Sequence, residues 1–181
     1  MDWSFYFISL LDALTMPHHS STNGIDTFIE YVGRVAGRAP AGWNGTAWFV
    51  LQIGEDCANI RTADFWNPLT FWRQMASAPP LRFGTDGFDP RLVDDANPAR
   101  HYTAFVFVGF WLPQLPGLML LVMWEIAGFF RYGGIWSQKD LACGLVGLRH
   151  GHAVRRFGPT VLPAFIAAEL ADTRFPPKSS T

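Results

Sequence analysis

The sequence predicts a mainly α-helical membrane protein: a single transmembrane helix, short amphipathic or interfacial helices, irregular extended segments and no independent globular core. Three observations lead to this prediction. Residues 104–130 are almost entirely apolar, 15% of the 181 residues are aromatic, and only 16% are charged, where soluble domains average about 25%. We therefore expect an N-terminal extramembrane region over 1–103, a span over 104–130 and a basic, glycine-rich extramembrane segment over 131–181.

Charge and cysteine content narrow the possible partners and cofactors. The net charge is −1, so the chain lacks the concentrated basic surface that nucleic-acid binding requires. The two cysteines, Cys57 and Cys143, form no metal-binding pattern and no disulfide framework. We therefore expect no nucleic-acid partner, no metal and no cofactor.

The first half of the N-terminal region predicts short helices. Residues 2–14 are apolar nearly all round but too few to cross a bilayer, so we expect them at the interface or against a partner. Residues 46–53 are apolar and favour a helix, with a strand as the open alternative. Between these segments, apolar residues follow the spacing of one helix face: Ile25, Phe28, Ile29 and Val32.

The second half of this region approaches the span. Asn67 suits a helix cap and Pro68 the first helical position, which predicts a further helix that ends before Pro79 and Pro80. Residues 81–100 are rich in glycine, proline, aspartate and asparagine, a composition typical of irregular structure.

The apolar run from 104 to 130 is the strongest feature of the sequence. Its 27 residues include only two strongly polar members, Gln114 and Glu125, and a span needs roughly 20 apolar residues. A central helix of an all-α bundle is the alternative, but the chain is too short to cover so long a helix on every side. Pro113 and Pro116 predict a kink, which neighbouring helices within a bilayer can accommodate.

The polar and small residues of the run share one stripe. Gln114 and Glu125 lie about 20° apart around a helix, and small residues on the same stripe permit close helix approach. For Glu125, simple access to the headgroup region is an open alternative. The stripe predicts a surface that packs against another subunit, formed by Gln114, Gly117, Leu121, Glu125 and Gly128.

The flanks of the run match a membrane boundary. Tyr102 precedes it and Tyr132 and Trp136 follow it, as interfacial aromatic residues do. Residues 131–156 carry five basic side chains against three in residues 82–100. Because basic residues stay inside, we expect the C-terminus in the cytosol, matrix or stroma.

The C-terminal segment offers two further surfaces. Gly144, Gly147 and Gly151 fall on one side of a helical wheel and predict a second face for close helix packing, with a loop as the alternative. On another arc, three residues are candidates for contact with lipid headgroups or an acidic partner: Arg149, His152 and Arg156.

No catalytic motif is recognisable, so we expect no enzymatic activity. The sequence contains no phosphate-binding glycine loop and no metal-spaced cysteine and histidine set. Whether a pigment, haem or lipid is bound stays open at His101, His150, His152 and Glu125.

Taken together, these features favour a protein that acts through contacts. The leading hypothesis is an accessory, structural subunit of a multi-subunit energy-transducing membrane complex, a respiratory-chain complex or ATP synthase of the mitochondrial inner membrane. It would contact membrane lipids and the other membrane subunits of a hetero-oligomer. One alternative is a pigment- or haem-binding subunit of a photosynthetic complex in a thylakoid or bacterial inner membrane. Another is a small membrane enzyme.

Overall fold

The computed structural model describes residues 23–67, 70, 74, 77–94, 96–131 and 137–174. The predicted helix over 2–14, most of the helix predicted after Asn67, and both Tyr132 and Trp136 lie outside these residues. Within them the chain forms six α-helices and two 3₁₀ turns. The elements are α2 (Gly24–Arg38), α3 (Trp43–Ala58), η1 (Thr62–Trp66), α5 (Pro98–Trp111), α6 (Gln114–Arg131), α7 (Gln138–Phe157), η2 (Pro159–Val161) and α8 (Leu162–Glu169).

Local signals in the sequence set several helix ends. The Asn23 side chain accepts a hydrogen bond from the Asp26 backbone N–H and caps α2, and Ser137 caps α7 through Asp140 in the same way. The helix α7 ends at Gly158, whose φ of +91° lies in the left-handed region that glycine adopts without strain. The helices predicted from the spacing of Ile25 to Val32 and from residues 46–53 are confirmed as α2 and α3.

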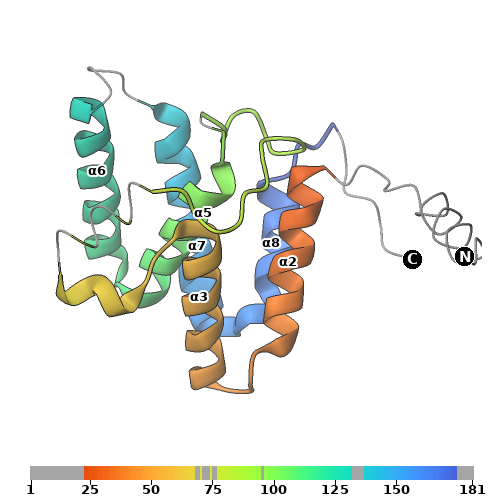
Figure 1. The fold of residues 1–181 in the computed structure, drawn as a ribbon. Helices are drawn as coiled ribbons and strands as arrows, with labels where there is room; N and C mark the ends of the chain where they lie inside the picture. The colour runs from red at the N-terminus through yellow and green to blue at the C-terminus, as the bar shows by residue number, and fades with distance from the viewer. Residues whose placement is uncertain are drawn as a thin grey trace, which may run out of the picture.

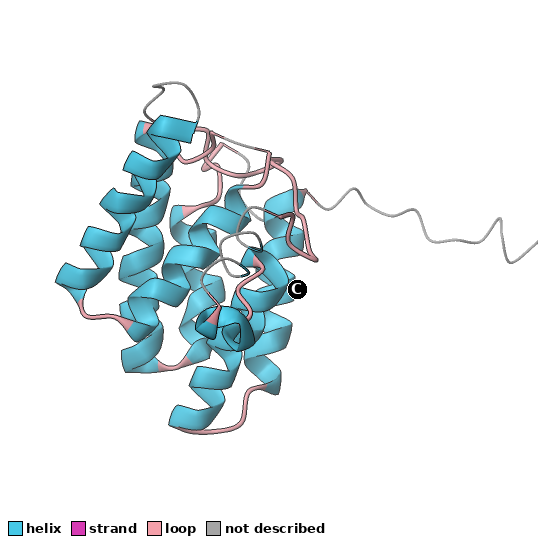
Figure 2. Cartoon of the chain, turned by 60° about the vertical axis from the view of Figure 1, so that its left-hand side comes forward, coloured by secondary structure: helices cyan, strands magenta, loops and turns pink. Residues whose placement is uncertain are grey.

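The helices pack around α5. This helix lies against α7 and α3, while α2 pairs with α8 on the opposite side of the bundle from α6 (Figure 1). Figure 2 shows the described chain as helices joined by loops. Phe88 and Ala171 form an isolated antiparallel bridge that ties the segment before α5 to the end of α8.

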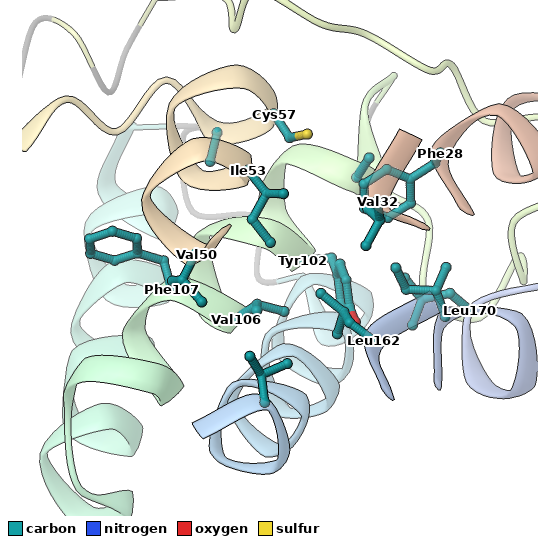
Figure 3. Close-up of a cluster of buried hydrophobic side chains, with 14 of the residues drawn as sticks. Phe28, Val32, Val50, Ile53, Cys57, Tyr102, Val106, Phe107, Leu162 and Leu170 are labelled. Carbon is teal, nitrogen blue, oxygen red and sulfur yellow. The ribbon is translucent and has the colours of Figure 1, made fainter. Parts of the chain in front are cut away.

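A contiguous hydrophobic core fills the space between these helices. Figure 3 shows side chains of α2, α3, α5 and α8 converging around Tyr102 and Val106. Phe28, Phe49 and Phe110 are at most 1% exposed. Burial of a large apolar side chain contributes roughly 1.5–3 kcal/mol. The prediction that the chain has no globular core of its own is therefore wrong.

The predicted transmembrane helix over 104–130 is also wrong. The apolar run is divided between α5 and α6, which meet at an extended Leu112 with φ −103° and ψ 147°. Proline disfavours helical geometry in the residue before it and offers no N–H to the helix ladder, so Pro113 ends α5 where a kink was expected.

Division of the run removes the basis for a span. None of the helices in the described residues is both long enough and apolar enough to cross a membrane. The predictions of a single-pass membrane protein and of a mitochondrial inner-membrane, thylakoid or bacterial inner-membrane location are therefore wrong. The chain was expected to be too short to cover a central helix of 27 residues. The central helix α5 has only 14 residues and is about 21 Å long, so the other helices can cover it.

Glycines allow α5 and α7 to approach until their backbones touch. A Cβ atom at Gly151 would overlap the carbonyl oxygen of Val106 and lie 2.7 Å from the Phe110 nitrogen. A Cβ at Gly147 would lie 2.6 Å from the carbonyl oxygen of Tyr102. These are backbone atoms that cannot rotate away, so the contact requires glycine.

Alanine substitutions test this packing. Gly151→Ala should destabilise the protein by about 1–3 kcal/mol, because α5 and α7 must move apart. Gly128→Ala is the matched control, since a Cβ there meets nothing within 4 Å. It should leave stability unchanged or raise it by up to about 1 kcal/mol through helix propensity. Equal effects of the two substitutions in urea unfolding would contradict the packing.

Candidate functional site: the two faces of α6

The inner face of α6 carries the stripe that the sequence assigned to another subunit. The structure places this stripe against α5 and α7 of the same chain. Leu121 is fully buried, and a Cβ at Gly117 would lie 3.1 Å from Leu148 Cδ2 and 3.7 Å from Val108 Cγ1. At the two ends of the stripe, Gln114 is exposed and Gly128 has no close neighbour.

The glycine face of α7 is likewise occupied within the chain. Gly147 and Gly151 contact α5, and Gly144 lies between Leu121 of α6 and Phe105 of α5. That these positions contact a different chain stays a prediction.

A buried carboxylic acid lies on the inner face of α6. Glu125 is 7% exposed, and its Oε1 is 3.7 Å from Nε2 of His101 on α5. Burial raises the pKa of Glu125 from 4.5 to about 7, and the negative charges of Asp140 and Asp94 add to the rise. Near neutral pH, Glu125 is therefore poised between its neutral and charged forms, with His101 of α5 3.7 Å away and the charge of Asp140 acting on it from α7.

This pKa makes stability depend on pH. The folded protein holds the Glu125 proton more tightly than the unfolded chain, so protonation of Glu125 contributes to the free energy of unfolding. This contribution is complete below pH 4.5 and is lost as pH rises to about 7. The full shift corresponds to roughly 3 kcal/mol. The substitution Glu125→Gln removes this pH-dependent contribution, because an amide does not titrate.

We therefore expect Glu125→Gln to gain stability relative to the unchanged protein as pH rises through this window. Urea unfolding of both proteins at pH 4.5 and near pH 8 measures the difference. A difference that is the same at both pH values would contradict the assignment of this titration to Glu125.

The outer face of α6 is apolar and exposed to solvent. Eight large apolar side chains of α6 are 38–78% exposed, and two of them, Leu118 and Leu120, lie at the margins of the exposed side. The six at its centre form the outer face: Leu115, Met119, Val122, Met123, Ile126 and Phe130. They fall within about 100° of arc around the helix, on the side opposite Leu121 and Gly117. The largest apolar patch of a typical monomer covers about 300–600 Å², and such a patch is often functional.

The six positions of the outer face are symmetric along the chain. They are separated by 4, 3, 1, 3 and 4 residues, so the pattern reads the same in both directions about the midpoint between Val122 and Met123. No charged residue interrupts the face between Leu115 and Phe130, because Glu125 points inward. This face was not predicted from the sequence, because the part of the apolar run outside the stripe of Gln114 and Glu125 was assigned to lipid, although the spacing is visible in the sequence.

A second polar cluster lies in the core between α5, α7 and α8. The Tyr102 hydroxyl and His150 Nδ1 are 2.8 Å apart, and His150 Nε2 is 3.2 Å from Oε1 of Glu169. Burial lowers the pKa of His150, and the hydrogen bond with Glu169 opposes this effect. Tyr102 is fully buried, so the cluster joins three helices inside the bundle.

Loss of the tyrosine hydroxyl should weaken this junction. In Tyr102→Phe, His150 Nδ1 loses its partner in a site that water does not reach, which should cost about 1–3 kcal/mol. Thermal or urea unfolding measures the loss. An unchanged free energy of unfolding would show that the hydrogen bond does not contribute.

The structure separates the residues predicted to face lipid. Tyr102 is in the core, Arg149 pairs with Glu169, and Nδ1 of the half-buried His152 lies 2.8 Å from the Leu148 carbonyl oxygen. Arg156 is exposed, with its guanidinium 5.1 Å from the centre of the Phe157 ring.

The described residues include no group of three or more histidine, cysteine, aspartate or glutamate side chains placed to hold a metal ion. Comparison with protein-family models, curated proteins and solved structures finds no match to this chain. The outer face of α6 is therefore assigned from its geometry alone.

Proposed function

We propose that this protein acts in assembly and that α6 is its docking element, with the outer face of α6 packed against the same face of a second copy. The observation that carries the proposal is the symmetric spacing of the six apolar residues at the centre of the outer face, with Leu118 and Leu120 exposed at its margins. A two-fold interface places the same surface on both partners, so its residues must complement one another when one helix is reversed.

The spacing meets this requirement in an antiparallel helix pair. With the two-fold axis at the midpoint of the pattern, Leu115 of one copy lies opposite Phe130 of the other. In the same way, Met119 lies opposite Ile126 and Val122 opposite Met123. Each large side chain thus meets another apolar side chain along a helix about 27 Å long.

The chemistry of the face also favours a second copy over a charged partner. The face offers no charge for an oppositely charged surface to recognise, and burial against an equally apolar surface leaves no polar group unpaired. Helix packing as the mode of action carries over from the sequence analysis. Assignment to an energy-transducing membrane complex rested on the span and has lost that support.

The test introduces charge into the face. Met119→Glu with Met123→Glu should dissociate the dimer, weakening it at least about 100-fold, because each interface would bury four unpaired carboxylates. Both methionines are more than half exposed, so the monomer should keep its helical content. Sedimentation equilibrium over a range of concentrations measures the association.

The matched control adds two charges elsewhere. Thr27→Glu with Gly37→Glu places them at exposed positions of α2, across the bundle from α6 (Figure 1), and should remain dimeric. A monomeric unchanged protein, or a Met119→Glu, Met123→Glu variant that dimerises normally, would overturn the proposal. So would an α6 face that binds only a different protein.

A further inference from the structure

A cleft of about 450 Å³ opens at the end of the bundle where α2 turns into α3 and α7 turns into η2, at the bottom of Figure 1. Its volume lies within the range of about 300–1,000 Å³ typical of small-molecule sites. One wall is apolar, formed by Ala36, Ala39 and Pro40, and Trp43 adds an aromatic surface.

Two arginines supply the polar wall. Arg155 and Arg156 line the cleft, and none of the lining residues is acidic. In the part of the chain that the structure describes, neither guanidinium forms an ion pair with a carboxylate, whereas Arg149 on the same helix is paired with Glu169. Two positive charges therefore share a cleft that has no acidic lining residue, in a chain whose net charge is −1.

Contacts within the protein hold Arg155 in place. Its Nη1 donates to the Phe110 carbonyl oxygen at 3.4 Å, and its guanidinium lies 5.8 Å from the centre of the Trp43 ring. The Trp43 ring in turn stacks on Phe110, with 5.0 Å between ring centres. A guanidinium has five N–H donors, so Arg155 keeps donors for a ligand.

The first turn of α3 completes the cleft. Gly42 and Trp43 line it, and Gly42 has no side chain with which to cap the helix. Free backbone N–H groups at a helix start favour an anion, and here they add to the two arginines.

Stabilisation of the α7 C-terminus is the simpler explanation for basic residues in its last turn. That explanation requires neither a hollow beside them nor an aromatic ring that orients one of them. A phosphate group carries nearly two negative charges at neutral pH and three acceptor oxygens, which suits two guanidinium groups. The volume also leaves room for an apolar group beside Ala36, Ala39 and Pro40.

We propose that this cleft binds a small phosphate monoester, with the phosphate on Arg155 and Arg156 and an apolar group against Trp43 and the alanine–proline wall. The site is on α2, α3, α7 and η2, so the proposal does not depend on the docking function of α6.

Phenyl phosphate is the probe, since it combines a monoester with one apolar ring. In isothermal titration calorimetry at fixed ionic strength near 0.15 M, it should bind the full chain at least 10-fold more tightly than inorganic phosphate or phenol. Backbone amide signals of Thr46, Gly158 and Thr160, which border the cleft, should shift in NMR spectra.

The variants isolate the arginines. Arg155→Gln with Arg156→Gln should weaken binding at least 10-fold, and Arg156→Gln alone should weaken it without loss of the Phe110 contact. Lys139→Gln is the matched control: it removes one positive charge from an exposed position of the same helix, about 24 Å away, and should leave binding unchanged.

Three results would overturn the proposal. Equal binding of phenol and phenyl phosphate would show that the charge is not recognised, and equal binding of inorganic phosphate would show that the apolar wall is not used. Equal loss of binding in Lys139→Gln and in the arginine variants would show that binding depends on the net charge of the protein and not on the arginines of the cleft. Thermal unfolding of each variant confirms that it is folded before the titrations are compared.

Discussion

Helices α5 and α7 touch backbone to backbone, because Gly147 and Gly151 leave no side chain between them and the carbonyl oxygens of Tyr102 and Val106. This contact sets the distance between α5 and α7 and so the position of α5 in the bundle. It brings Tyr102 within hydrogen-bonding distance of His150, and it places the other sides of α5 against α3 and the core residues of α2. A larger residue at either glycine would push α5 and α7 apart.

The same arrangement accounts for the two faces of α6. The break at Leu112–Pro113 turns the chain back so that α6 lies along α5 and α7 at the edge of the bundle (Figure 1). Its inner face buries Leu121 and Glu125, and burial of the carboxyl raises its pKa to about 7. The outer face has no helix left to cover it in the described part of the chain, although its residues are as apolar as those of a core.

The sequence predicted features that depend on neighbouring residues and failed where distant segments meet. The spacing of Ile25 to Val32 identified α2, and the alignment of Gly144, Gly147 and Gly151 indicated a face for close approach. Wheel positions within one helix do not reveal which helix approaches, so α5 was not identified as the neighbour. Pro113 was expected to kink one long helix. The length of the apolar run favoured a single span, so the end of a helix at Pro113 was not predicted. The cleft is lined by Trp43 and Arg155, which both contact the buried Phe110, and only the tertiary fold brings these three residues together.

The close contact between α5 and α7 within a single chain determines how the other helices pack. Nuclear Overhauser effects in the isolated protein test it, because glycine α-protons at 147 and 151 should show cross-peaks to protons of Tyr102, Val106 and Phe110. We expect these cross-peaks together with a break in the sequential helical pattern at Leu112 and Pro113. A continuous helical pattern from 104 to 130, without cross-peaks from Gly147 or Gly151 to α5, would contradict the account.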